Sequence, residues 1–194
     1  QEYQVTIDGQ SYPVARPFMV LATQNPIEQE GTYPLPEAEL DRFLFKIRMP
    51  LPSAADEPAI VAAVTAPRGQ ASDYLDRVTP VATLADWPLW QQEVQAVHTD
   101  AAVIDYAVRV CRATREWPGL QRGAGPRGSI SLVLAARARA LLAGRDFVTP
   151  DDIKALGLPV LRHRVRLSAE AEIEGRDADG ILGTLLDGVA APRA

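Results

Sequence analysis

The sequence has little of the chemistry that builds disulfide frameworks, metal centres or nucleophilic active sites. Cys111 is the only cysteine among the 194 residues, which excludes an internal disulfide and a cysteine-rich metal site. It lies in an apolar helical pattern, so we expect a small core residue. The two histidines, His98 and His163, are 65 residues apart and have no ligand-like partners, so no metal site is predicted. Ser129 and Ser131 have no paired histidine, which gives a serine hydrolase no support.

Long apolar runs and targeting signals are also missing. No uninterrupted apolar stretch approaches the roughly 20 residues that a membrane-spanning helix requires. The N-terminal residues from Gln1 include no basic region followed by an apolar one, so no secretory signal is predicted. The first residue is also not a methionine, which is typical of a chain that starts in the middle of a domain. We therefore expect a cytoplasmic protein without a membrane span.

The charge balance predicts no general affinity for nucleic acid. The net charge is −5, which gives no overall electrostatic attraction to phosphate backbones. Two arginine clusters are expected to be solvated faces of a helix or strand. They are Arg109, Arg112 and Arg115, and Arg162, Arg164 and Arg166. With 47% apolar residues, a chain of this length can bury a real core and form one or two domains.

The first 50 residues are predicted to be part of a larger α/β domain. Val5–Tyr12 reads as a β-hairpin with Asp8-Gly9 as its two-residue turn. Phe18–Ala22 is a short apolar run, as in a parallel strand that is covered on both faces. Phe43–Met49 begins apolar and then alternates, as in a strand nearer the edge of a sheet. Two parallel strands cannot form a stable sheet by themselves, because such sheets need helices on both faces.

After residue 52 the apolar periodicity becomes helical. Pro50–Ser53 is a predicted linker, because proline fixes the backbone and removes hydrogen-bond donors. We therefore divide the chain into residues 1–52, the C-terminal part of an α/β core, and residues 53–194, an all-helical bundle. Helices are expected near residues 60–64 and 84–97, from Asp100, from Pro126 to Ala143, from Thr149, and near residues 181–186. Val160–Leu167 could be helix or strand.

Two of these helices have predicted inward faces. Asp100 can cap the third helix, whose apolar stripe is Val103, Ile104, Ala107, Val108 and Cys111. The fourth helix is expected to end at Gly144 and to turn inward Ile130, Val133, Leu134, Ala138, Leu141 and Leu142. Thr149 and Pro150 begin the fifth helix as cap and first residue, with acidic residues following in the first turn.

Asn25 is the first candidate functional residue. It follows the predicted strand Phe18–Ala22, and the carboxyl ends of parallel strands are where open α/β sheets place their ligand chemistry. Its amide could donate a hydrogen bond to a phosphate oxygen or orient a water molecule. The alternative is an Asn-Pro turn, in which the side chain of Asn25 only caps its own loop.

Arg42 is the second candidate. It stands near the end of the run Pro34–Phe43, at the boundary between a short helix-like stretch and the next predicted strand. An unpaired arginine at such a boundary is suited to reach phosphate, also on a neighbouring molecule. The alternative is an ordinary ion pair with Glu37, Glu39 or Asp41.

Arg127 is the third candidate, in the first turn of the helix that begins at Pro126. The helix dipole makes this end positive, which is unfavourable for an arginine but favourable for binding an anion. Arg127 would add a bidentate donor for that anion. Arg122 is a competing candidate five residues earlier, and either could be a plain surface charge.

These segments closely resemble the MoxR family of AAA+ ATPases. The resemblance runs from about residue 5 to residue 186 and is densest at residues 20–45 and 123–167. It implies that Asn25 is the sensor 1 residue, between a metal-binding acid and the γ-phosphate. It implies that Arg42 is the arginine finger presented to the adjacent subunit, and that Arg127 is the sensor 2 arginine, which contacts terminal phosphates in cis. Gly125 and Gly128 depart from the Ser and Ala that are usual in the family, which loosens that turn.

For the whole protein the resemblance implies an ATP- and Mg²⁺-dependent remodeller that forms a homo-oligomeric ring, a hexamer, and acts on a client protein complex. The fold implied is the remnant of a P-loop AAA+ α/β core, a β-hairpin plus two parallel strands, followed by an all-α lid bundle. The chain has no Gly-x-x-x-x-Gly-Lys-Ser/Thr loop and no apolar strand that ends in Asp-Glu. We therefore expect that this chain alone hydrolyses no ATP.

Two other function classes stay open at this point. The chain could be a non-enzymatic interaction module, a lid and partial sheet that docks on another protein. It could also be part of a nucleic-acid-dependent AAA+ motor, since such motors also place an arginine before a phenylalanine in this way. A phosphate-binding loop encoded in frame upstream of Gln1 would favour the ATPase, whereas a start codon at that position would favour the interaction module.

Overall fold

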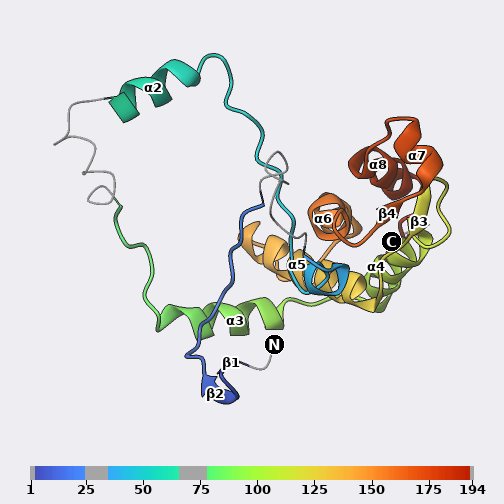
Figure 1. Ribbon diagram of the computed structural model, residues 1–194. Helices are drawn as coiled ribbons and strands as arrows, with labels where there is room; N and C mark the ends of the chain where they lie inside the picture. The colour runs from blue at the N-terminus through green and yellow to red at the C-terminus, as the bar shows by residue number, and fades with distance from the viewer. Residues whose placement is uncertain (1–2, 25–34, 66–77, 193–194) are drawn as a thin grey trace.

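The computed structural model describes residues 3–24, 35–65 and 78–192 of the chain (Figure 1). A β-hairpin comes first, and helices dominate the remainder. The elements are β1 (Gln4–Ile7), β2 (Gln10–Pro13), α1 (Glu37–Leu40), α2 (Glu57–Thr65), α3 (Asp86–Ala96), α4 (Ala101–Ala113), β3 (Leu120–Arg122), α5 (Pro126–Leu142), α6 (Pro150–Leu161), β4 (Arg166–Leu167), α7 (Ala169–Ile173) and α8 (Ala178–Gly188).

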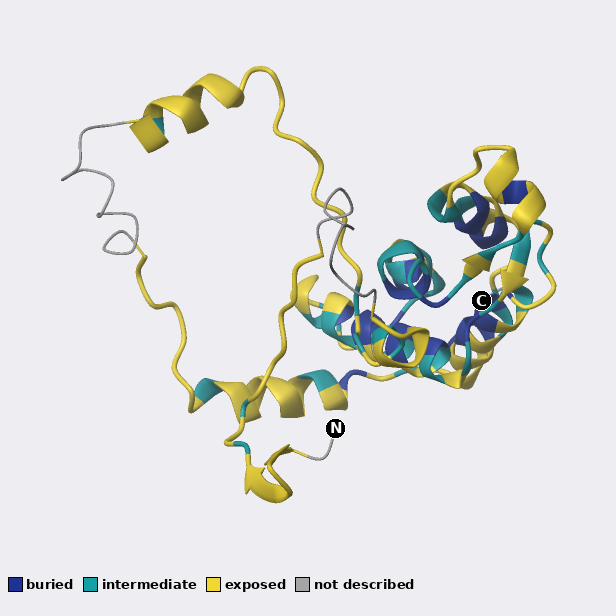
Figure 2. Ribbon diagram, in the orientation of Figure 1, coloured by how far each residue is buried: buried dark blue, intermediate teal, exposed yellow. Residues whose placement is uncertain are grey.

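The core lies in a helical bundle built from the C-terminal half of the chain. Helix α5 packs against both α4 and α6, and α8 packs against α6. Figure 2 shows the buried residues gathered in these helices, and among the described residues they begin at Val97. The largest apolar side chains in this core are Tyr106, Leu132, Ile153, Leu161, Ile181, Leu182 and Leu185. The helical bundle predicted for this part of the chain is confirmed, whereas the division at residue 52 stays a prediction.

Side-chain caps begin helices α4 and α6, as the sequence predicts. The Asp100 carboxylate accepts a hydrogen bond from the Ala102 amide at 2.7 Å. At the start of α6, Asp152 accepts from the Thr149 amide at 2.8 Å and is completely buried. Burial alone would raise the pKa of Asp152, but hydrogen bonds from Arg145, Thr149 and Arg139 hold this pKa well below its usual range. The bundle thus encloses one ionised carboxylate, held by two arginines.

The predicted β-hairpin is confirmed. Strands β1 and β2 are antiparallel, with Val5 opposite Tyr12. Asp8 and Gly9 form the turn with φ angles of +50° and +79°, the left-handed pair that a two-residue hairpin turn requires.

The two predicted parallel strands are not formed in the described residues. Residues 18–22 and 43–49 have no strand pairing, and Leu21 and Met49 are 85% and 87% exposed. A parallel strand needs a neighbouring strand and a helical layer on each face, and the described residues supply neither for these segments. The part of the fold-class prediction that named two parallel strands is therefore wrong for this structure.

The inward faces predicted for α4 and α5 are partly wrong. In α4 the buried set includes Tyr106 and Val110, while Ile104 and Val108 are 42% and 36% exposed. In α5 the buried residues are mostly small, namely Gly128, Ser131, Leu132, Ala135, Ala136 and Ala140. A Cβ added at Gly128 would lie 3.2 Å from the Cys111 Sγ, so the small residues allow α4 and α6 to approach closely. Both faces of α5 carry apolar residues, so hydrophobic periodicity alone cannot select one.

The stretch Val160–Leu167 begins in a helix and ends in a strand. Helix α6 ends at Leu161, and β4 then pairs antiparallel with β3, joining Leu167 to Leu120. Helix α7, which the sequence pattern did not predict, is capped by Ser168, whose hydroxyl accepts from the Ala171 amide at 3.3 Å. These short elements place the residues after α6 beside β3 and the start of α5.

Candidate functional site

Asn25, the first of the predicted site residues, lies outside the described residues. The chain is described up to residue 24 and again from residue 35. The structure therefore does not place the side chain of Asn25, and its role in phosphate or water contact stays a prediction.

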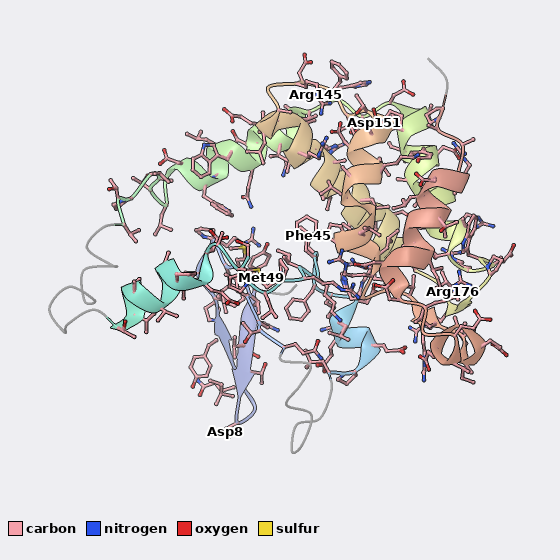
Figure 3. The ribbon with its side chains drawn as sticks, turned by 90° about the horizontal axis from the view of Figure 1, so that it is seen from above. Asp8, Phe45, Met49, Arg145, Asp151 and Arg176 are labelled. Carbon is pink, nitrogen blue, oxygen red and sulfur yellow. The ribbon has the colours of Figure 1, made fainter. Side chains whose placement is uncertain are left out.

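The segment that carries Arg42 runs along the C-terminal end of α6. The Lys46 amide donates to the Pro159 carbonyl at 2.9 Å, and Arg162 donates from Nη1 to the Lys46 carbonyl at 3.2 Å. The last carbonyls of a helix have no partner within the helix, so the Lys46 amide satisfies one of them. Figure 3 shows Phe45 at this end of the bundle and Met49 farther along the same segment. Phe45 packs against the hydrophobic core, so this segment is fastened by backbone bonds and by one aromatic side chain.

Arg164 is the centre of this attachment. Its side chain is 2% exposed, and Nε donates to the Asp41 carboxylate at 3.0 Å. Nη2 donates to the Asp41 carbonyl at 3.0 Å and to the Phe43 carbonyl at 2.6 Å, and Nη1 donates to the Leu44 carbonyl at 3.2 Å. Burial lowers the pKa of Arg164, and the Asp41 carboxylate opposes that effect. A guanidinium remains charged under these conditions, so Arg164 is a buried cation whose partners surround Arg42.

His163 adds a further contact to the same segment. Its Nε2 lies 3.0 Å from the Phe43 carbonyl, and since a carbonyl only accepts, Nε2 carries the proton. Burial lowers the pKa of His163 from 6.5 to about 4, the charges of Arg164 and Lys46 act in the same direction, and the Phe43 carbonyl opposes them. His163 is therefore a neutral donor at pH 7.

Arg42 differs from its neighbours, because its side chain is exposed and has no ion pair or hydrogen-bond partner in the described part of the chain. The acidic residues nearby contact other arginines. Glu37 pairs with Arg122, and Asp41 pairs with Arg164 and, at 3.6 Å, with Arg127. The alternative prediction, an ion pair of Arg42 with Glu37, Glu39 or Asp41, is not observed.

Arg122 lines a basic cleft, which we call the arginine cleft, and Arg127 contacts one of its lining residues, Asp41. It encloses about 400 Å³ between α1, the start of α5 and the residues after α6. Its lining includes five basic residues besides His163, namely Lys46, Arg122, Arg162, Arg164 and Arg166, and two acidic residues, Glu37 and Asp41. Arg127 reaches the carboxylate of Asp41 from the first turn of α5. The excess of cations in a chain of net charge −5 favours an anionic ligand in this cleft.

The sequence analysis missed the role of the second arginine cluster. A solvated face was predicted, and this is correct for Arg166, whose side chain is 63% exposed, but wrong for Arg162 and Arg164, whose side chains are 12% and 2% exposed. The signal available was the position of Arg162, His163 and Arg164 directly after a helix end, where carbonyls need donors. Sequence alone could not show that the acceptors would come from a segment about 120 residues earlier.

Neither a metal centre nor a membrane-spanning helix is found within residues 3–24, 35–65 and 78–192. No group of three His, Cys, Asp or Glu side chains there could hold a metal ion. No helix in that part is long and apolar enough to cross a bilayer.

Comparison with known proteins finds two family models that match different parts of the chain. Residues 1–45 match the family described as ATPases associated with various cellular activities, and residues 112–184 match the AAA lid domain. The chaperone MoxR1 of Mycobacterium tuberculosis is 38% identical over the whole of this chain. The chain belongs to the MoxR family of AAA+ ATPases. Within this MoxR-family chain, Arg42 and Asp41 lie in the ATPase match, and Arg122, Arg127 and Arg164 lie in the lid match.

Other relatives of this MoxR-family chain give the same result. The uncharacterised protein YeaC of Bacillus subtilis is 44% identical over 99% of the chain, and the MoxR protein of Methylorubrum extorquens is 32% identical over 80% of it. A crystal structure of a proposed ATPase from Cytophaga hutchinsonii superposes with a TM-score of 0.86 at 35% identity, over 99% of this chain and 59% of that one. The chain spans 58%, 52% and 50% of YeaC, MoxR1 and the M. extorquens protein, about half the length of its curated relatives.

Proposed function

We propose that this chain supplies the arginine finger, Arg42, the sensor 2 arginine, Arg127, and the helical lid of a MoxR-type AAA+ ATPase. The whole protein would bind ATP with Mg²⁺, form a homo-oligomeric ring and use hydrolysis to remodel a client protein complex. The observation that carries the proposal is that the side chain of Arg42 has no ion-pair or hydrogen-bond partner among the residues that the structure describes. Its acidic neighbours Glu37 and Asp41 are held by arginines of the lid match, so its own guanidinium is available to a phosphate.

The arginine cleft fits the phosphates of a nucleotide better than it fits a metal ion. Its lining is mainly cationic, and the pair between Arg127 and Asp41 is long, at 3.6 Å, and partly exposed. Such a pair contributes little, so a phosphate group could replace the carboxylate as the partner of Arg127. The described residues offer no carboxylate cluster for Mg²⁺, so we assign no step of this chain to the metal.

Each proposed residue has a separate task. The guanidinium of Arg42, presented to the adjacent subunit, would stabilise the negative charge that develops on the transferring phosphoryl group. A guanidinium supplied in this way contributes about 10³ to 10⁵ in rate. Arg127 would donate to the terminal phosphates of bound nucleotide, and Asn25 would orient a water molecule or a phosphate oxygen. The chain alone is expected to show no phosphate release above background.

The test of this proposal is turnover in a full-length protein that contains this sequence. Arg42→Ala should lower kcat by at least about 10³-fold while the affinity for ATP stays near normal, because its target lies in the next subunit. Mixing the variant with a subunit that cannot bind nucleotide but keeps its own arginine should restore part of the turnover. Normal turnover of Arg42→Ala rings, or no restoration in mixed rings, would contradict the assignment.

Mixed rings also test the task of Arg127. The sequence predicts a contact in cis, so Arg127→Ala should weaken ATP binding, and mixing should not repair that subunit's own site. Arg127 also lies close to Arg42 in the chain's fold, however. It contacts the carboxylate of Asp41, and Asp41 directly precedes Arg42. Restored turnover in mixed Arg127→Ala rings would therefore assign both arginines to the neighbour's nucleotide. Unchanged binding and turnover would move the assignment to Arg122.

A further inference from the structure

Hydrogen bonds hold the backbone on both sides of Arg42, although its side chain has no partner within residues 3–24, 35–65 and 78–192. The guanidinium of Arg164 donates to the carbonyls of Asp41, Phe43 and Leu44. One side chain thus binds the backbone before and after Arg42. The bond from Nε to the Asp41 carboxylate at 3.0 Å adds a charged contact. This arrangement restricts where the backbone of Arg42 can lie.

Arg164 is itself anchored in two helices of the bundle. It donates to the Val160 carbonyl of α6 and, at 3.2 Å, to the Ser131 hydroxyl of α5. The guanidinium therefore bridges α5, α6 and the segment that carries Arg42. His163, the preceding residue, donates to the Phe43 carbonyl.

The chemistry of this contact requires an arginine. A guanidinium offers five N–H donors in a rigid plane, whereas a lysine ammonium is a point charge with three. Six acceptor atoms in the structure contact Arg164, which a lysine could not satisfy together. A buried ion pair of this kind often contributes little net stability, but removing one partner is strongly destabilising, so a test of Arg164 must separate function from folding.

We infer that Arg164 is a positioning residue for Arg42, because it fixes the backbone of the arginine finger to the lid helices α5 and α6. A movement of these helices relative to the ATPase core would then move Arg42 as well. This inference rests on the proposed function of Arg42, and it adds the residue that positions Arg42. Arg164 itself contacts no nucleotide.

The first experiment measures kinetics in a full-length protein with Arg164→Met and Arg164→Lys. We expect kcat to fall by about 10- to 100-fold in Arg164→Met, as small misplacements of catalytic groups do, while the KM for ATP changes less than about twofold. Arg164→Lys should keep more of kcat than Arg164→Met, because it retains the charge beside Asp41. An equal loss of ATP affinity would make Arg164 a nucleotide contact and overturn the inference.

Arg145→Met is the matched control. Arg145 also binds a buried carboxylate, that of Asp152, but at the opposite end of α6. Its loss should lower the melting temperature without a fall in kcat of the folded protein. If both arginine variants lower kcat equally, the effect of Arg164 is general destabilisation and the inference fails. If Arg164→Met does not fold, Ser131→Ala, which removes one anchor, should still lower kcat with unchanged KM, and normal kcat there would contradict the inference.

The decisive measurement is a double-mutant cycle with Arg42→Ala. If Arg164 acts only through Arg42, Arg164→Lys should lower kcat in the wild-type background and have no further effect in Arg42→Ala. Additive losses would overturn the inference. If Arg42→Ala alone retains full turnover, the proposed function fails instead. Amide exchange gives a second readout, since Arg164→Met should speed exchange of the Lys46 amide and leave that of Val110 unchanged.

Discussion

Residues 97–189 and the described residues before them differ in packing far more than in composition. The later part buries apolar side chains from four helices in one core, whereas no described residue before Val97 is buried. Apolar residues are present in both parts. Leu21 and Leu51 in the earlier part are 85% and 89% exposed, whereas Leu132 and Leu161 in the later part are completely buried. An apolar pattern thus predicts which face of a segment can be buried. The face is buried only where another part of the protein packs against it.

Helix α2 shows the same lesson within one element. It is helical from Glu57 to Thr65, yet none of its residues is buried, and Val61 and Val64 are 59% and 72% exposed. Helix α8, only slightly longer, buries Ile181 and Leu185 against the bundle. Local propensity forms both helices, while tertiary contacts stabilise only the second.

The segment 41–46 is one of the early stretches that contact the bundle, as Arg48 and helix α3 also do. It is joined to the bundle by the side chain of Phe45 and by donors from the residues after α6. The two regions therefore contact each other where Arg42 lies. The following experiments test how strongly the two regions differ in folding and packing.

The largest expected effect is the difference between the two parts as separate fragments. Residues 53–194 should melt cooperatively with strong helical circular dichroism, because burial at about 25 cal/mol per Å² can offset the ordering entropy of a domain this size. Residues 1–52 alone should be disordered or aggregate, since their strands have no sheet. A folded 1–52 fragment would contradict the division. Residues 36–194, which keep the acceptors of Arg164, should melt at a higher temperature than residues 53–194.

A pair of leucine substitutions tests the same difference inside the intact chain. Leu161→Ala should lower the free energy of unfolding by about 2–5 kcal/mol, because Leu161 is completely buried and its loss leaves a cavity. Leu51→Ala, at an exposed position, should change it by less than about 0.5 kcal/mol. Denaturant unfolding followed by circular dichroism measures both. A comparable loss in the two variants would show that the early region is packed in solution.

The smallest effect concerns the contact between the regions at His163. Its pKa is about 4 in the folded chain and near 6.5 when unfolded, so between these values the unfolded state binds more protons. Stability should therefore fall as the pH drops from about 6.5 to 4 and should not depend on His163 above that window. Melting temperatures across this range should vary less in His163→Gln than in the wild type. The control His98→Gln, at an exposed position, should keep the full dependence, and an equal dependence in His163→Gln would contradict the assignment.

Several features were predictable because their signals are local. The Asp8-Gly9 hairpin turn, the Asp100 cap and the Thr149-Pro150 start of α6 each depend on a few neighbouring residues. The parallel strand at residues 18–22 was not formed, because a strand of that kind depends on partners elsewhere. The face of α5 was assigned only partly correctly, since apolar residues lie on both sides of that helix.

The same contrast holds at the candidate site. The sequence by itself determined the candidates Asn25, Arg42 and Arg127, because their motifs are short and continuous, and it determined the family through them. Only the tertiary structure decided which cations are free. Arg164 lies 123 residues from Asp41 in the chain, and folding brings its guanidinium to that carboxylate, into a place where burial requires every donor to find an acceptor. Hydrogen-bond pairing over such a separation is a property of the packed molecule, and no pattern along the sequence records it.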